Sequence, residues 1–254
     1  MEMKKIRLLL ALVLGVSFSG RAQILRSAGT LLVDVSADTI TANDGDVVAQ
    51  WANGGTLGGT FAAVTNNAGV SFTNNIFGKK AVLFRGIECN ALTNSVATPA
   101  SLTGNSAWSM EAWVWVDAVP SAKAVYLSWT EHGAADMYDP SRLMFRYDNG
   151  NVAVDNLNGT VGYGYGLPAA GAWHHMAVVR NTFKQEKVFV DGNAVAFSWC
   201  AAGVQSGIPL SLGAVKKYSA ASYTNFFRGP CRVCVSTQVC SPIRTCCITT
   251  SRML

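Results

Sequence analysis

Two segments of the sequence carry aromatic rings suited to binding sugars, and the first of them, residues 129–142, also carries charged side chains. An aromatic ring packs against the apolar face of a sugar, while polar groups bond its hydroxyls. Both segments are predicted to be loops, where recognition residues usually lie on a rigid scaffold. The alternative is that the rings only cover an edge of the fold. We expect the ligand-binding residues to be Trp129, Glu131, Asp136, Tyr138, Arg142, Tyr163 and Tyr165.

The adjacent histidines His174 and His175 have the chemistry of a metal pair or a general base. They lie in a run that predicts a β-strand, where neighbouring side chains point to opposite faces. The two rings therefore cannot converge on one site, and we expect structural roles for both. His132 stands alone in a predicted loop. The sequence also lacks the Gly-x-Ser-x-Gly, His-Glu-x-x-His and P-loop motifs, so no catalytic residue is predicted.

Carboxylates in predicted turns supply the hard oxygen ligands that calcium prefers. Aspartate is also common in turns because its side chain bonds the nearby backbone, so no individual metal site is assigned. Calcium is the cofactor that these loops could hold, and nothing in the sequence makes a cofactor necessary. The candidate ligands are Asp34, Asp38, Asp44, Asp46, Glu131, Asp136 and Asp139.

The composition indicates a folded protein with many turns. Half of the 254 residues are apolar and 14% are charged, so a core can form and disorder is not expected. The 24 glycines indicate frequent turns. The net charge of +5 comes from scattered residues, several of them near the two ends of the chain. No Lys/Arg cluster with interleaved aromatic residues occurs between them, which argues against nucleic-acid binding.

The first 22 residues have the pattern of a secretory signal peptide. Lys4–Arg7 is positively charged, Leu8–Val16 is a short apolar run, and Gly20-Arg21-Ala22 fits a cleavage site before Gln23. The apolar run is short for a membrane span, although an uncleaved anchor is the alternative. We expect a protein that is secreted, or located at the cell surface or in the periplasm, with no membrane span after cleavage.

Short apolar runs separated by Gly, Asn and Asp predict an all-β fold. Leu31–Val35 is predicted to be the first strand, and Trp108–Asp117 a long strand that ends before Pro120. Two hairpins are predicted, with turns at Asp148-Asn149-Gly150 and at Asp191-Gly192. No stretch shows sustained helical periodicity. The pattern predicts one domain, built as a sandwich or a barrel.

The stretch from Trp108 to Phe197 resembles the laminin-G-like jelly rolls of the concanavalin A-like lectin/glucanase superfamily. The resemblance is carried by Ser109–Val114, by Trp173–Arg180 with the pattern W-H-H-x-A-x-x-R, and by the hairpin Val188–Gly192. It implies a two-sheet antiparallel jelly-roll sandwich over residues 23–230. This fold hosts lectins, glycosidases, adhesion modules and passive accessory domains, so the resemblance by itself does not assign a function.

The glucanase branch of this superfamily uses carboxylates in an E-x-D-x-E pattern on one strand. Residues two apart share a face of a strand, which lets an acid and a nucleophile flank one bond. The corresponding acidic strand here begins at Glu111, and the positions two and four residues later hold Trp113 and Trp115. The required carboxylate pair is absent from this strand. We therefore expect a binding module, with a glycosidase as the alternative.

The last 24 residues differ in character from the rest. Five of the seven cysteines fall there, but their spacing matches no standard zinc site and the tail has no histidine. Read one nucleotide out of register, residues 232–240 give R-V-R-L-H-T-G-V-L and residues 241–250 give S-D-T-D-V-L-H-N-Y. That string resembles the closing segment of the family. We interpret residues 231–254 as a frameshifted tail, with a genuine Cys-rich extension as the alternative, and expect the closing strand to be missing and a sheet edge unfilled.

Three functions are compatible with these patterns. The first is an exported carbohydrate-binding or adhesion module, part of a larger secreted protein, whose partner is a glycan or an extracellular protein. The second is a glycoside hydrolase with a carboxylate pair that the strand pattern does not reveal. The third is a structural spacer without a ligand of its own. The absent E-x-D-x-E pattern favours the first over the second.

Overall fold

The computed structural model describes residues 30–64, 70–76, 78–85, 90–104, 106–115, 124–129, 131–132, 144–148, 151–156, 159–161, 168–199, 206–217, 223–224 and 228–232. These residues form β-strands and two short 3-10 helices, η1 (Ala37–Thr39) and η2 (Ala100–Leu102). In this part of the chain no helix is long and apolar enough to cross a membrane. The protein is therefore all-β in the residues described, as the sequence predicts.

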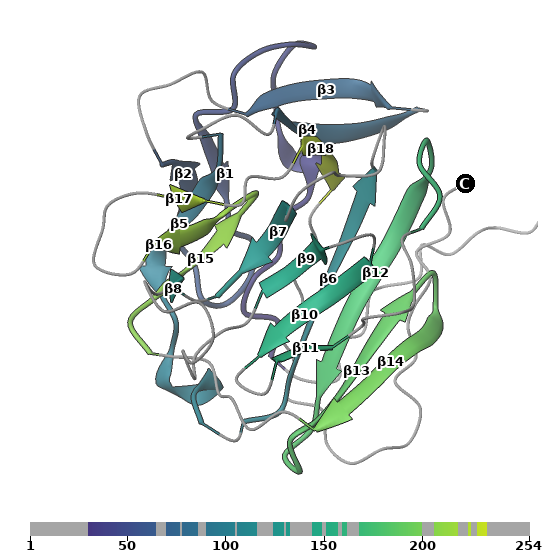
Figure 1. Ribbon diagram of the computed structural model, residues 1–254. Helices are drawn as coiled ribbons and strands as arrows, with labels where there is room; N and C mark the ends of the chain where they lie inside the picture. Colours follow the sequence, from purple (N-terminus) through teal and green to yellow (C-terminus); the bar gives the residue numbers. More distant parts are fainter. Residues whose placement is uncertain are drawn as a thin grey trace, which may run out of the picture.

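The strands form two large sheets and one small sheet (Figure 1). The eight-stranded sheet has the order β1 (Gln50–Ala52), β2 (Thr60–Ala63), β5 (Leu92–Ala97), β15 (Pro209–Leu212), β7 (Ala124–Ser128), β9 (Met144–Asp148), β10 (Asn151–Asn156) and β11 (Gly159–Val161). The seven-stranded sheet has the order β14 (Asn193–Trp199), β13 (Gln185–Val190), β12 (Trp173–Arg180), β6 (Trp108–Trp115), β18 (Arg228–Arg232), β4 (Lys79–Arg85) and β3 (Ser71–Ile76). The small sheet contains β17 (Tyr223–Thr224), β16 (Val215–Lys217) and β8 (Glu131–His132).

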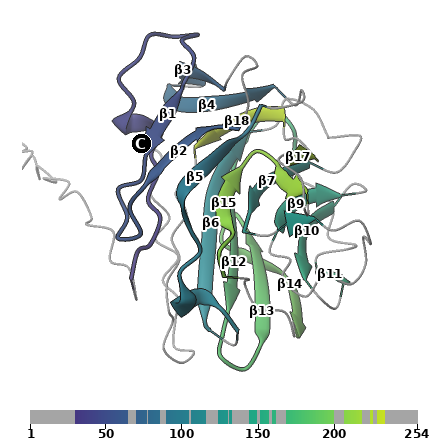
Figure 2. The same cartoon turned by 90° about the vertical axis from the view of Figure 1, so that its left-hand side faces the viewer.

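The two large sheets pack face to face across a shared core (Figures 1 and 2). One hydrophobic cluster contains Phe61 and Leu92 from the eight-stranded sheet together with Met110 and Val178 from the seven-stranded sheet. Every strand pair within these two sheets is antiparallel. Two antiparallel sheets around one core form a β-sandwich, which confirms the fold class predicted from the sequence.

Strand β6 shows why these residues form a sandwich. Met110, Ala112 and Val114 are buried in the core, and the residues between them, including Glu111 and Trp113, are partly exposed. This alternation has the two-residue period of a strand with one covered face. β6 pairs along its whole length with β12, which makes this pair the centre of the seven-stranded sheet.

The hairpin between β13 and β14 has the predicted turn chemistry. Asp191 has φ +50° and Gly192 has φ +79°, and two successive positive φ angles are typical of the tight turns that match the twist of paired strands. The register shifts by one residue between Val188 and Phe189. Beyond this bulge, β14 continues along β13 to Trp199 and forms one edge of the sheet.

The predicted first strand at Leu31–Val35 is wrong, because this segment is extended but belongs to no sheet. Its backbone accepts hydrogen bonds from a turn instead: Gly54 N donates to Asp34 O, and Leu57 N donates to Leu32 O. The Asn53 side chain holds the same turn through four hydrogen bonds of 2.8 to 3.0 Å. A tight turn therefore satisfies the backbone that a neighbouring strand would otherwise pair.

The closing strand that we expected to be missing is present in part, and the expectation of an unfilled sheet beyond Arg232 stays a prediction. β18 lies inside the seven-stranded sheet, where it pairs with β4 over Arg228–Cys231 and with β6 over its last two residues. Cys231 faces Val114 and Arg232 faces Trp113 across this pairing. The first two residues of the predicted tail thus belong to the closing strand, and residues 233–254 lie outside the described residues.

Candidate functional site

The predicted ligand-binding set is only partly described by the structure. Trp129 follows β7, and its side chain is 0% exposed within the core instead of lying in an open loop. It continues the alternation of Leu127, two residues earlier, which is also in the core, so its expected role as a ligand contact is corrected to core packing. Glu131 begins β8, where only its backbone is described. The remaining predicted contacts, Asp136, Tyr138, Arg142, Tyr163 and Tyr165, lie outside the described residues.

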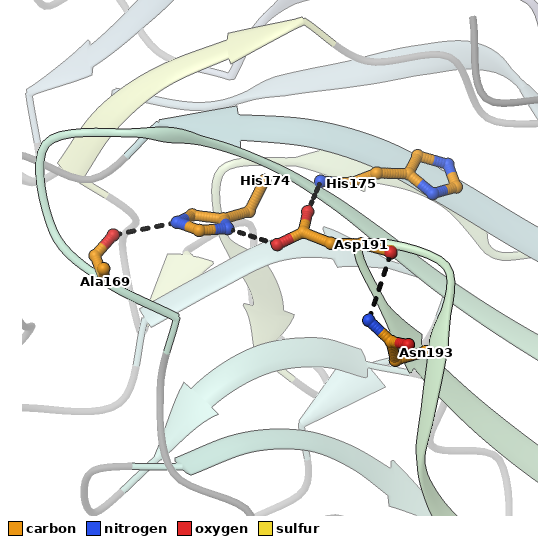
Figure 3. Close-up of polar contacts among 5 residues, drawn as sticks. All are labelled: Ala169, His174, His175, Asp191 and Asn193. Atoms are coloured by element: carbon orange, nitrogen blue, oxygen red, sulfur yellow. Dashed lines mark hydrogen bonds and ion pairs between the residues drawn. The ribbon is translucent and has the colours of Figure 1, made fainter.

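The two adjacent histidines of β12 diverge, as the strand geometry predicts. His174 Nδ1 lies 2.7 Å from Asp191 Oδ2, whereas the His175 ring contacts Glu111. Figure 3 shows the His175 ring pointing away from the His174 ring and from the Asp191 carboxylate. The two rings therefore cannot bind one metal ion or serve one substrate together.

His174 belongs to a clamp at the end of the β12–β13–β14 unit (Figure 3). Its Nε2 lies 2.8 Å from the backbone oxygen of Ala169, so both ring nitrogens face oxygen acceptors. The other Asp191 oxygen accepts from the backbone N–H of His175 at 2.9 Å, and Asp191 N donates to His175 O at 2.8 Å. The carboxylate thus ties the turn to β12, and His174 has no ring nitrogen left for a substrate.

His175 lies on the outer face of the seven-stranded sheet, the side that points away from the core. Its Nε2 is 3.2 Å from Glu111 Oε2, and its ring centroid is 5.1 Å from that of Trp113 on the neighbouring strand. The residue is 5% exposed, and its Nδ1 has no hydrogen-bond partner in the part of the chain that the structure describes. The Glu111 side chain is 29% exposed. This cluster offers one carboxylate, one imidazole and one indole.

This cluster is not the paired-carboxylate arrangement of a glycosidase. Hydrolysis by that route needs two carboxyl groups on opposite sides of the bond that breaks. Glu111 is bonded to His175, and the same-face positions of its strand hold Trp113 and Trp115. Within the described residues, no three His, Cys, Asp or Glu side chains gather to hold a metal ion. The described part of the face therefore carries one carboxylate at this place and not the pair that this reaction needs.

Two of the candidate calcium ligands near the N-terminus, Asp38 and Asp46, form hydrogen bonds within local turns. Asp46 Oδ2 accepts from the backbone N–H of Asn43 at 2.8 Å, and Asp38 Oδ2 accepts from Ser36 Oγ at 3.4 Å. These are local contacts within three residues of chain, as expected of aspartate in turns. Asp136 and Asp139 lie outside the described residues, so calcium binding by those loops stays a prediction.

The outer face continues across β12 and β13 to the edge strand β14. Val179 faces Lys187, and Lys187 faces Phe197, so these residues extend the side of the sheet that carries Glu111. Phe197 is 50% exposed and Trp199 is 58% exposed. Sequence analysis missed this pair. Their spacing of two in a predicted hairpin strand put both rings on one side, and the buried Ala196 directly before Phe197 marks the opposite side as the one that faces the core.

The two antiparallel sheets packed around one core place this chain among β-sandwiches of jelly-roll type. A family model described as the concanavalin A-like lectin/glucanases superfamily, of the laminin-G kind, matches residues 90–229. The chain belongs to this superfamily. Comparison with curated protein sequences finds no match.

Similar solved structures include two toxin binding domains and one domain of an arabinanase. The binding domain of Paraclostridial Mosquitocidal Protein 1 has a TM-score of 0.54 at 12% identity over 82% of this chain and 48% of that chain. The binding domain of botulinum neurotoxin serotype D has a TM-score of 0.56 at 8% identity over 84% of this chain and 49% of that chain. Domain 4 of AbnA, an extracellular arabinanase from Geobacillus stearothermophilus solved with arabinotriose, has a TM-score of 0.49 at 13% identity over 84% of this chain and 94% of that chain.

These likenesses concern the fold. The match to the mosquitocidal protein domain covers 48% of that chain, so this chain spans about half of its length. At 8% and 12% identity, the two toxin domains support the β-sandwich architecture and say nothing of individual contact residues.

Proposed function

We propose that this chain is a non-catalytic carbohydrate-binding module of an exported protein. One observation supports this proposal over hydrolysis. In a superfamily of lectins and glucanases, the acidic strand of this chain carries the single carboxylate Glu111, which is bonded to His175 and followed on its face by Trp113 and Trp115. A module with this strand keeps a surface suited to sugars and lacks the acid and nucleophile pair.

The proposed contacts include the two predicted aromatic loops. With Trp129 removed because it is buried, they are Glu131, Asp136, Tyr138, Arg142, Tyr163 and Tyr165. Loops at the end of a rigid sandwich can vary without disturbing the core, which suits them to recognition. The signal-like first 22 residues support an extracellular or periplasmic location, where glycans are accessible.

A glycan array probed with the full chain, with calcium and with chelator, tests the proposal. We expect binding to one class of glycan and no release of reducing sugar from the bound glycans over a day. Release of reducing sugar would replace the binding module with a glycosidase. Absence of binding under both conditions would favour a structural spacer.

A variant pair tests the loops. The double change Tyr163→Ala and Tyr165→Ala is expected to weaken binding about tenfold, which corresponds to the loss of about 1.4 kcal/mol of contact. The matched control Tyr223→Ala removes a partly buried tyrosine in β17, outside the proposed set, and is expected to leave the dissociation constant unchanged. Equal affinities for the wild type and the loop variant would remove these two residues from the site.

A further inference from the structure

The edge of the seven-stranded sheet gathers exposed aromatic side chains. Among the described residues, the large hydrophobic side chains with high exposure are Val47, Phe183, Phe197 and Trp199, and three of these four are aromatic. Phe197 and Trp199 project from the same side of β14. Phe183, 68% exposed, lies in the β12–β13 turn, two residues before the Gln185 that pairs with Trp199. Scattered exposed apolar residues are ordinary, but aromatic rings gathered at one place indicate a contact surface.

The geometry of the two β14 rings provides two different stacking surfaces. Their centroids are 6.3 Å apart and their planes are inclined by 76°, an edge-to-face arrangement that stabilises the pair. Because the planes are steeply inclined, the exposed ring faces point in different directions. A flat apolar partner would cover one of them, whereas a chain of rings with bends between its units can contact both.

Two hydrogen-bond donors of β13, the Gln185 amide and the Lys187 ammonium, belong to residues that pair with these two aromatic residues. Gln185 faces Trp199, and its Oε1 accepts from Asn181 Nδ2 at 2.7 Å, which fixes the amide and leaves the Gln185 NH2 group without an acceptor among the described residues. Lys187 faces Phe197 and is exposed. Neither Lys187 nor Lys184 has an ion-pair partner among the described residues. Oriented donors beside aromatic faces are the groups that bind sugar hydroxyls and carboxylates.

The charge of this surface is one-sided. Lys184 and Lys187 are the described charged residues of the β12–β13 turn and the facing part of β13 that are not buried, while Glu186 is buried on the opposite face. The described carboxylate of the outer face, Glu111, lies on β6, two strands away from β13. An anionic partner is therefore attracted, and its carboxylate can accept from the ammonium and the amide.

A second copy of this chain fits the surface less well. A two-fold dimer buries the same patch on both subunits, so Lys184 and Lys187 of each copy would enter one interface. Like charges that face each other in a sheet or an interface are destabilising. The same side chains favour an acidic ligand, and the exposed rings favour one that has apolar ring faces.

We infer that Phe197 and Trp199, with Gln185 and Lys187, form a binding site for acidic oligosaccharides whose sugars carry carboxylates. The inference rests on the proposed carbohydrate-binding function and names the ligand class and a set of residues other than those of the two predicted loops. The sugar rings stack on the two aromatic faces, and a sugar carboxylate pairs with Lys187. This pairing makes the affinity fall as salt concentration rises.

Titration calorimetry of the full chain with hexuronate tetramers, and with neutral hexose tetramers of the same linkages, tests the site. We expect Trp199→Ala and Phe197→Ala each to weaken hexuronate binding at least tenfold. Lys187→Gln is expected to weaken hexuronate binding three- to tenfold and to leave any neutral binding unchanged. The matched controls are Val47→Ala, an exposed apolar residue elsewhere, and Lys80→Gln on β4, and both are expected to bind as the wild type does.

The outcomes separate the site from the proposed function. Binding that survives Trp199→Ala and Phe197→Ala but is lost in the Tyr163/Tyr165 variant would overturn this site and leave the carbohydrate-binding function in place. Equal binding of acidic and neutral tetramers, with no effect of Lys187→Gln, would overturn the acidic class. Absence of hexuronate binding by the wild type would overturn the inference, whereas a glycan array without any binding, or release of reducing sugar, would overturn the proposed function. Circular dichroism melting of each variant confirms that the exposed changes leave the fold intact.

Discussion

The two faces of the seven-stranded sheet are built from the same strands and differ sharply. On the inner face, Met110, Val178 and Val188 are fully buried in one apolar cluster. On the outer face, the side chains change from the nearly covered His175 on β12 to the exposed Phe197 on β14. The inner face can therefore tolerate little change in volume, while the β14 end of the outer face can vary without disturbing the core. Side chains that pack in the core and side chains that face outward thus alternate residue by residue along each strand.

The histidine pair repeats this contrast within two residues. His174 is held at both ring nitrogens by Ala169 and Asp191, whereas His175 uses one nitrogen to contact Glu111. A motif with two adjacent histidines resembles a metal or catalytic pair in sequence. In the structure, His174 bonds the turn of the β13–β14 hairpin, and His175 packs among outer-face residues. Both histidines therefore have structural roles.

The largest expected difference between the faces is in the cost of removing volume. Met176→Ala empties a fully buried position of β12 and is expected to lower the free energy of unfolding by about 2–5 kcal/mol. Phe197→Ala removes a larger side chain from the exposed face and is expected to change it by less than about 0.5 kcal/mol. Urea denaturation of both variants measures the difference. Similar losses in the two variants would mean that the outer face is covered at β14 as well.

The next effect concerns the clamp between the hairpin turn and β12. Asp191→Ala removes the acceptor of the His174 ring and of the His175 N–H, and an unsatisfied buried donor costs about 1–3 kcal/mol. Alanine also tolerates the positive φ of this position poorly, at a further cost of about 1–2 kcal/mol.

Asp191→Asn is the matched control for this clamp. Asparagine accepts a positive φ and keeps one side-chain oxygen, so thermal unfolding is expected to show a smaller loss than for alanine. An Asn variant as unstable as the Ala variant would show that the carboxylate itself, and not the shape of the turn, holds the two elements together.

The sequence predicts most of the inner face and little of the outer face. Alternation in Trp108–Trp115 and the Asp-Gly turn at Asp191 identify strands and a hairpin, because both signals are local. Alternation does not say what covers the outer side. For that reason Phe197 and Trp199 were not among the predicted contacts, while Trp129 was predicted to be accessible and is buried.

Pairing between distant segments is the other part that local patterns do not reveal. Leu31–Val35 has strand-like residues, yet its backbone bonds the turn fixed by Asn53. β18 takes its place between β4 and β6, although its five residues include Gly229 and Pro230 and look unlike a strand. The frameshift of residues 231–254 stays a proposal, and sequencing the gene with peptide mass spectrometry of the C-terminus tests it. Peptides in the present frame, with relatives that share the cysteines, would contradict it.

The smallest expected effect is at the boundary between the two faces, in the Glu111–His175 pair. Glu111→Gln keeps the shape of the side chain and removes its charge, and a partly exposed pair of this kind contributes about 0.2–1 kcal/mol. A double-mutant cycle with His175→Gln, measured by urea denaturation, isolates the coupling between the two side chains. A coupling above 2 kcal/mol would mean that the pair is as important to the fold as the inner face. A coupling near zero would leave Glu111 as a carboxylate available to a bound ligand.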